Sequence, residues 1–112
     1  HPNYKAKILK AKDIDTIATG KRLGHPVRCL KNQFSRELFK QEYNPQVTDE
    51  QLEQMGAGAL RKAAKEGDEK NGSFMAGQCA AMVHQEQTAQ EMIEEMFAQA
   101  EQLLKKSPSY CS

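Results

Sequence analysis

One short segment of the chain, residues 72–78, combines residue types that could hold a planar or anionic ligand. Its sequence is Gly-Ser-Phe-Met-Ala-Gly-Gln, and the glycines Gly72 and Gly77 let a backbone approach a ligand closely. A loop that runs into a helix offers unpaired amides to an anion or a ring carbonyl, and the Gln78 amide can both donate and accept. The segment has neither the Lys-Ser/Thr of a Walker motif nor G-x-G-x-x-G spacing. A ligand-facing turn and a tight packing turn therefore both stay open.

A second candidate is the turn Gly24-His25-Pro26-Val27-Arg28. The guanidinium of Arg28 presents a planar fork of donors that suits a phosphate or a carboxylate. Turns also carry such residues for structural reasons alone, so ligand contact and a structural turn are both retained as interpretations. The histidines His1 and His84 have no Cys or Ser at motif spacing, and His84 is expected in solvent.

The cysteines indicate no metal or disulfide framework. Cys29, Cys79 and Cys111 are odd in number, far apart and outside any C-x-x-C motif. This spacing excludes a pair of disulfides and the usual paired zinc ligands, and it favours free thiols of a cytoplasmic protein. No nucleophile, base and orienting group stand together in the sequence, so no catalytic residue is predicted.

Composition narrows the class of protein. The 112 residues carry 16 Lys and Arg against 15 Asp and Glu, a net charge of +1, which argues against a dedicated nucleic-acid binder. Hydrophobic residues make up 38% of the chain and form no run of 18, so no membrane span is expected. Because the chain opens on His1 rather than Met, we expect a segment of a longer protein.

The elements that must position the candidate residues can be predicted from periodicity in the first half of the chain. Residues 3–12 suit a short basic helix with Asn3 as its N-cap. Residues 16–19 and 26–30 are expected to form an antiparallel hairpin around two glycines. Ile17, Val27 and Cys29 are expected to share its buried face.

The second half is predicted to be helical. A helix over residues 35–43 is followed by one that opens on the Thr48-x-x-Gln51 capping box and ends near Gly67. The glycine pair Gly56 and Gly58 inside it suggests a kink or a close contact with another backbone. A second capping box, Thr88-x-x-Glu91, opens the last helix, which ends at residues 107–108. The methionines Met92 and Met96 are expected to be core. The apolar residues that recur at helical spacing are Met92, Ile93, Met96, Phe97, Ala100, Leu103 and Leu104.

Several motifs occur in an order that carries a resemblance. They are Asp13-x-Asp15-Thr16, Gly24-His25-Pro26-Val27-Arg28-x-Leu30-Lys31-Asn32, Met55-Gly56-Ala57-Gly58-Ala59-Leu60 and Asn71-Gly72-Ser73-x-Met75-Ala76-Gly77-Gln78. The series resembles the C-terminal part of the flavin-dependent enoyl-acyl-carrier-protein reductase II proteins, within the nitronate monooxygenase (2-nitropropane dioxygenase-like) family. The resemblance covers His1 to about Leu104. Lys21-Arg22, Ala81 and Met82 depart from the family pattern.

The resemblance implies a mainly α segment with a small antiparallel hairpin, the lid subdomain and closing helices of an FMN-binding TIM barrel. Residues 1–67 then form the lid-like subdomain, 68–107 the flavin-side loop and closing helices, and 108–112 a tail. The cofactor-binding residues implied are Gly72, Ser73, Met75, Ala76, Gly77 and Gln78. His25 and Arg28 are implied at the substrate entrance.

By the same resemblance, the parent enzyme reduces enoyl thioesters of fatty-acid synthesis with NAD(P)H, or oxidises nitronates. The family's catalytic histidine and FMN phosphate loops have no counterpart in these residues, and a barrel takes about 250 residues. We therefore expect the chain alone to be inactive and to hold no FMN tightly, with the remainder of the barrel as its partner. A homo-oligomer stays open. The alternative is a non-enzymatic helical module whose Met-rich stripe binds a partner protein.

Overall fold

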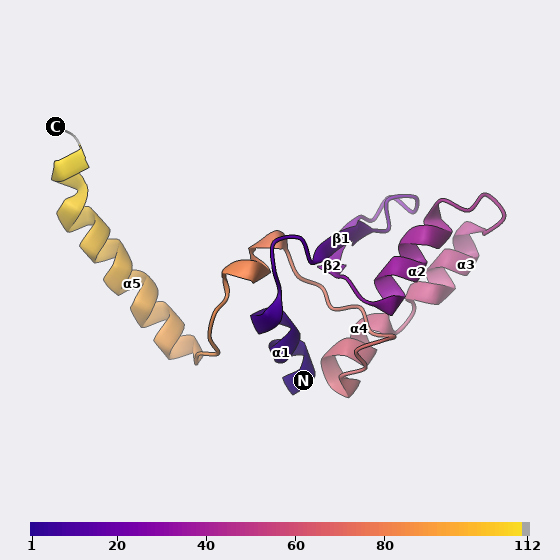
Figure 1. Ribbon diagram of the computed structural model, residues 1–112, viewed down its shortest axis with the longest axis horizontal. Coiled ribbons are helices and arrows are strands. Elements are labelled where there is room, and N and C mark those ends of the chain that lie inside the picture. Colours follow the sequence, from indigo (N-terminus) through magenta and orange to yellow (C-terminus); the bar gives the residue numbers. More distant parts are fainter. Residues whose placement is uncertain (111–112) are drawn as a thin grey trace.

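The computed structural model describes residues 1–110 as a mainly helical chain with a two-stranded antiparallel hairpin, as predicted (Figure 1). The elements in order are α1 (Pro2–Lys10), β1 (Thr16–Thr19), β2 (Val27–Leu30), α2 (Gln33–Glu42), α3 (Asp49–Gly56), α4 (Ala59–Arg61), a π turn (Lys62–Glu66), a 3₁₀ turn (Gln78–Met82), α5 (Ala89–Lys106) and a final 3₁₀ turn (Ser107–Tyr110). We call residues 1–82 the body and α5 the arm. None of the described helices combines the length and apolar character needed to cross a membrane.

The hairpin gains a third extended segment that the sequence did not predict. β1 and β2 pair from Thr16 opposite Leu30 to Thr19 opposite Val27. On the other edge of β2, the Leu30 amide donates to the Phe74 carbonyl at 2.8 Å, and the Ala76 amide donates to the Arg28 carbonyl at 3.1 Å. The loop over residues 72–78, the first candidate ligand-binding segment, therefore adds a third extended segment to the hairpin.

The buried face of the hairpin differs from the prediction at one end. Cys29 is buried as expected, whereas Val27 is 37% exposed. Ile17 lies opposite Cys29 and is half-buried. Because Val27 starts its strand next to the exposed Pro26, it lies beyond the part of the sheet that the rest of the body covers.

The core of the body centres on Phe74, which has no exposed surface and which the sequence did not single out. Phe74 packs with Leu30 and Ala63, and partly buried residues of α1 pack against the three. The rings of Tyr4 and Phe74 lie 4.9 Å apart at 55°. Full burial of a phenylalanine side chain contributes about 1.5–3 kcal/mol. This one residue therefore connects α1, β2 and the π turn that carries Ala63.

Local capping signals set the helix boundaries. Thr48 with Gln51 and Thr88 with Glu91 form the two predicted capping boxes. α2 begins earlier than predicted because Asn32, paired with Ser35, caps it.

The predicted N-cap of the first helix is wrong. The ring nitrogen Nδ1 of His1 accepts the amide of Asn3 at 3.1 Å, so His1 is the cap and α1 ends at Lys10. The Asn3 side chain is engaged elsewhere: its amide donates to the Gly67 carbonyl at 2.9 Å. Because the two bonded residues are 64 positions apart in the sequence, the residues around Asn3 gave no local signal for this bond.

The long helix predicted from Thr48 is broken at the glycine pair. Ala57 is extended and Gly58 takes φ +73°, a left-handed conformation that favours glycine. The chain then resumes as α4 and the π turn and ends at Gly67, which is also left-handed at φ +64°. The kink suggested by the sequence is thus confirmed as a corner that turns α4 toward the core.

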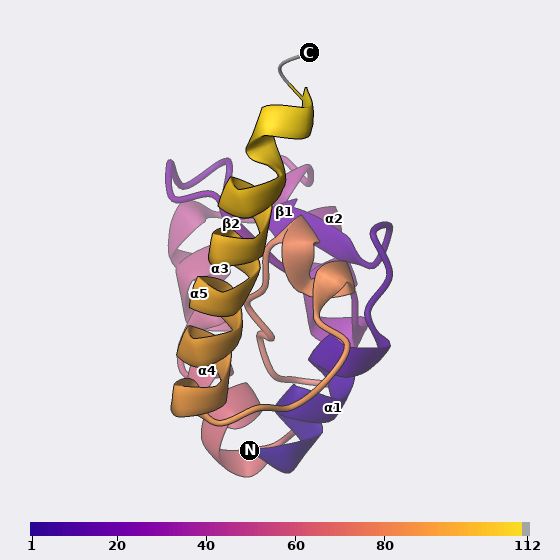
Figure 2. The same ribbon diagram turned by 90° about the vertical axis from the view of Figure 1, so that its left-hand side faces the viewer.

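The arm extends away from the body in Figure 1. In Figure 2, turned by 90°, it lies in front of the body and only its C-terminal end projects beyond it. The radius of gyration is 18.5 Å, whereas a compact chain of this length has about 13 Å. No residue of α5 is buried, and Met96 is 62% and Phe97 74% exposed. The expectation that Met92 and Met96 belong to a core is therefore wrong for the described residues, since Met92 also is 41% exposed.

Candidate functional site

The first half of the loop over residues 72–78 is packed inside the body. A β-carbon added to Gly72 would lie 2.6 Å from the Asp68 carbonyl oxygen and 2.8 Å from the backbone of Ala63. Packing therefore requires glycine at this position. The Gly72 carbonyl accepts the side-chain amide of Asn32 at 2.7 Å. Ser73 is buried, and its amide donates to the Ala59 carbonyl.

The turn before this loop is held by one carboxylate. Asp68 accepts the backbone amides of Lys70 and Asn71 at 3.1 and 3.0 Å, and the Asn71 side chain as well. These bonds, chiefly that from the Asn71 backbone, hold the pKa of the exposed Asp68 carboxyl below its usual range. These hydrogen bonds therefore fix the backbone conformation of residues 68–71, which lead into Gly72.

The second half of the loop faces outward. The Met75 carbonyl accepts the Tyr4 hydroxyl at 2.6 Å, while Met75 as a residue is 40% exposed. Burial raises the pKa of Tyr4, so its hydroxyl stays protonated as a donor at neutral pH. Gly77 and Gln78 are exposed, and Gly77 precedes the short 3₁₀ turn.

Gly77 contrasts with Gly72. A β-carbon at position 77 meets only the Cys79 sulfur, at 3.6 Å, which is an ordinary contact, and φ is −76°. Nothing within the described residues therefore requires glycine at position 77.

The hairpin residues His25 and Arg28 are both exposed. The Arg28 guanidinium donates to the Thr16 hydroxyl at 3.1 Å, across the hairpin, and pairs with no carboxylate of the described residues. Burial raises the pKa of the Cys29 thiol beside it, so this thiol stays neutral. Arg28 therefore presents its remaining N–H donors at the surface.

The hairpin tip is anchored from outside. The buried Glu42 carboxylate accepts the Gly20 amide, and the His25 amide donates to the Gly20 carbonyl at 3.0 Å. Arg22 donates to the Val47 carbonyl at 2.6 Å and pairs with Asp49 at 2.8 Å. The tip that carries His25 is thus fixed against the loop between α2 and α3.

The structure brings some of the predicted site residues together and separates others. The hydrogen bond from Ala76 to Arg28 places the outer loop and the Arg28 strand side by side. No hydrogen bond among the described residues joins His25 to the loop. Gly72 and Ser73 lie on the packed side, whereas Met75, Gly77 and Gln78 lie on the accessible side.

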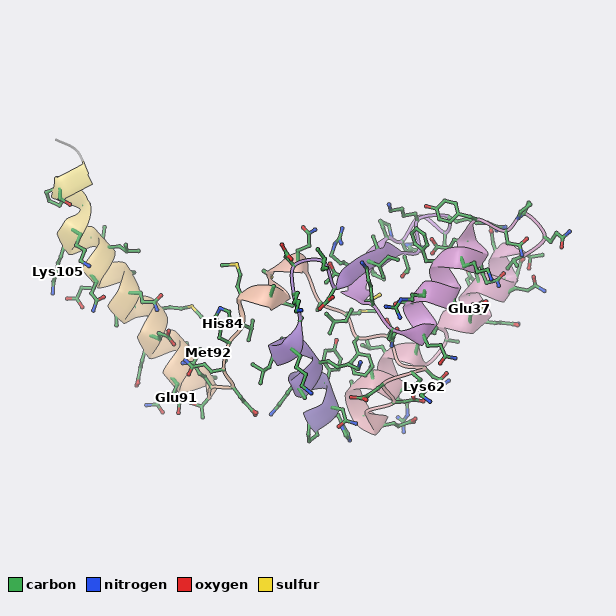
Figure 3. The ribbon with its side chains drawn as sticks, in the orientation of Figure 1. Glu37, Lys62, His84, Glu91, Met92 and Lys105 are labelled. Atoms are coloured by element: carbon green, nitrogen blue, oxygen red, sulfur yellow. The ribbon has the colours of Figure 1, made fainter. Side chains whose placement is uncertain are left out.

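No group of three potential metal ligands occurs in residues 1–110. His84 lies near Met92 in residues 83–88, which we call the connector between the body and the arm (Figure 3). Sequence reasoning missed Tyr4, whose hydroxyl fixes the loop from a distant helix. The available signal for this role was the single aromatic residue, Tyr4, on the lysine-rich helix α1.

A cavity of about 310 Å³ lies between the connector and the arm. Its lining includes the exposed Met82, Val83, Met92 and Met96. A thioether-rich, aliphatic lining of this kind suits packing against another apolar surface.

Comparisons with known proteins agree on one family. The family model described as nitronate monooxygenase matches residues 1–99. A probable nitronate monooxygenase of Staphylococcus saprophyticus is 30% identical over 104 residues, which are 92% of this chain and 28% of the relative.

Two solved structures of FabK from Thermotoga maritima are also similar. One is 40% identical with a TM-score of 0.89 and covers 98% of this chain and 34% of that one. An M276A mutant is 34% identical with a TM-score of 0.78 and covers 98% and 32%. The chain spans about a third of the length of these relatives.

Proposed function

This chain belongs to the nitronate monooxygenase family, and from that membership we propose that it works as the lid and closing helices of an FMN-dependent oxidoreductase with a TIM barrel. The proposed reaction is reduction of an enoyl thioester with NAD(P)H. The observation that carries the proposal is the similarity of 98% of this chain to one third of FabK, at a TM-score of 0.89.

The arm supports this proposal. Its apolar stripe is exposed along the helix, and an amphipathic helix that buries nothing within its own chain needs a partner surface. The same extended arrangement matches a solved chain about three times as long. We assign the stripe to contact with the remainder of the barrel.

The outer loop is proposed to border the flavin. FMN, when bound, supplies the hydride-transfer chemistry. Gly77 gives the flat ring room, and the Gln78 amide is free to donate to a ring carbonyl or accept from a ring N–H. The Tyr4 hydroxyl, through the Met75 carbonyl, holds the loop in place. Gly72 and Ser73 support the loop from behind.

The hairpin is proposed to bind the substrate. Arg28 presents an unpaired guanidinium on the strand that adjoins the loop, where it can attract a phosphate or carboxylate of the substrate's carrier group. His25 lies at the anchored tip and borders the entrance. Because Glu42 and Arg22 fix this tip, the substrate meets a preformed edge.

The direct test is a Gln78→Ala substitution in the whole protein, with FMN affinity measured by flavin fluorescence. We expect about tenfold weaker FMN binding, since one hydrogen bond to a buried ring is lost. Gln54→Ala, an exposed glutamine on α3, is the matched control and should change nothing. A whole protein with no flavin absorbance contradicts the proposal and favours a non-enzymatic module.

Nitronate oxidation is the second candidate, because the family model and the staphylococcal relative both carry that name. The two reactions are separated by assaying the whole protein for NAD(P)H oxidation with a crotonyl thioester and for oxygen consumption with a nitronate. Activity with the thioester alone supports the reductase, and activity with the nitronate alone overturns it. Residues 1–112 by themselves are expected to be inactive in both assays.

A further inference from the structure

A groove of about 420 Å³ lies between α1 and the start of α2, away from the site described above. Its lining consists of Ala6, Lys7, Lys10, Ala11, Asp15, Leu30, Lys31, Arg36 and Glu69. None of these residues belongs to the loop over residues 72–78 or to the pair His25 and Arg28. The groove is therefore a separate feature of the body.

The lining is dominated by positive charge. The lining contains four cationic and two carboxylate side chains, which gives an excess of two positive charges around the groove. None of the four cations forms an ion pair within residues 1–110. A concave surface of one sign of charge concentrates the field that attracts an oppositely charged ligand.

Neither carboxylate of the lining forms an ion pair with these cations among residues 1–110. Asp15 is held locally, because its carboxylate accepts the Lys12 amide at 2.9 Å. The Asp15 carbonyl accepts the Lys31 amide at 2.7 Å, which fixes the backbone at the groove edge. Glu69 is exposed on the turn before the loop.

Helix stability explains only half of the cations. Lys7 and Lys10 lie in the last turn of α1, where positive charge is favourable. Lys31 and Arg36, in contrast, lie at the start of α2, whose first turn has no acidic residue. Positive charge at that end opposes the helix dipole, so α2 does not need these two side chains for its own stability.

We propose that this groove binds the phosphate group of a small phosphorylated molecule. The excess of two positive charges matches a phosphate monoester, which carries about −1.5 to −2 at neutral pH. Arg36 supplies the planar fork for two phosphate oxygens, and the lysines supply point charges. The volume lies within the range of about 300–1,000 Å³ typical of small-molecule sites, and Ala11 and Leu30 leave an apolar floor for a short carbon chain.

The test is titration of the whole protein with glycerol 3-phosphate, followed by calorimetry. We expect saturable one-to-one binding with a Kd of about 1 mM or tighter, weakening as salt is raised. Arg36→Gln combined with Lys10→Gln should weaken binding at least about tenfold. Lys40→Gln, on the same helix as Arg36 but outside the groove, should leave the Kd unchanged.

A variant expected to tighten binding distinguishes the loss of a phosphate contact from a folding defect. Glu69→Gln removes a negative charge from the lining and should tighten binding by about two- to tenfold, an effect that misfolding does not produce. Equal affinity in all variants overturns the proposal, because binding then occurs elsewhere, for example at the flavin site. Absence of saturable binding also overturns it.

Discussion

The body and the arm of this chain both present amphipathic helices, yet only the body buries them. In the body, α1 packs its apolar face against Phe74, which has no exposed surface. In the arm, Phe97 occupies a comparable apolar stripe and is 74% exposed. Helical periodicity therefore identifies a face that needs a partner, and it does not say whether the partner lies in the same chain.

The comparison is tested most severely by truncating one phenylalanine in each region. Phe74→Ala should lower the free energy of unfolding of the 112-residue chain by about 3–5 kcal/mol, because it opens a cavity at the centre of the core. Phe97→Ala should change it by less than about 0.5 kcal/mol, since its ring contacts little within the chain. Urea unfolding measures both. Equal losses would show that the arm packs on the body.

The next effect concerns the packed end of the loop. Gly72→Ala should cost about 1–3 kcal/mol of unfolding free energy, because the new methyl group meets the backbone of Ala63 and Asp68. Gly56→Ala is the control: its β-carbon meets nothing within 4 Å, so a neutral or slightly stabilising change is expected. A tolerated alanine at position 72 would remove the packing reason for that glycine.

Removing each of the two capping boxes compares the body with the arm through a smaller change in stability. Thr48→Ala and Thr88→Ala each remove a cap worth about 1 kcal/mol. For α3, which packs on α2, the loss should shift the unfolding midpoint of the body. For the arm, the loss should reduce helical circular dichroism without moving that midpoint. A midpoint shift in Thr88→Ala would contradict the independence of the arm.

The smallest effect is a pH dependence within the body. Burial raises the pKa of Cys29 above its ordinary value of 9.0, against the opposing hydrogen bond with the Thr19 side chain. The folded state then binds more protons than the unfolded state above pH 9, so stability is complete below that pH and falls as pH rises through the folded pKa. Urea unfolding from pH 8 to 10 measures the decline.

Cys29→Ala provides the check on this decline, with Cys79→Ala as the exposed control. The alanine at position 29 should flatten the part of the alkaline decline that begins near pH 9. The alanine at position 79 should leave the curve unchanged. If Cys29→Ala retains the full decline, the buried thiol is not its source.

The features that could be predicted from sequence are those carried by neighbouring residues. The capping boxes at Thr48 and Thr88, the stop at Gly67 and the hairpin strands each depend on residues within a few positions of one another. Their geometry is local, so the residue types sufficed. Asn32 was missed as a cap because Ser35, its partner, itself looks like a helix start.

The features that could not be predicted depend on contacts across the chain. The third extended segment exists because Phe74 and Ala76 pair with β2, about 45 residues earlier, and no local pattern marks this pairing. Within the candidate loop, only the neighbours of Gly72 reveal that its glycine serves packing. The outward exposure of Gly77 and Gln78 likewise depends on the pairing of the preceding residues with β2.

The connector between body and arm is fastened to α1 by the Lys5–Glu86 pair, two exposed side chains 2.6 Å apart. The arm beyond it has 18 residues. Such a helix is about 27 Å long, so a rotation of about 10° at its base displaces its far end by about 5 Å. Small rotations at the base of the arm are thus amplified at its C-terminal end, and one exposed ion pair in the connector is too weak to fix the direction of the helix. Accurate placement of Leu103 and Leu104 must therefore come from contacts distributed along the stripe.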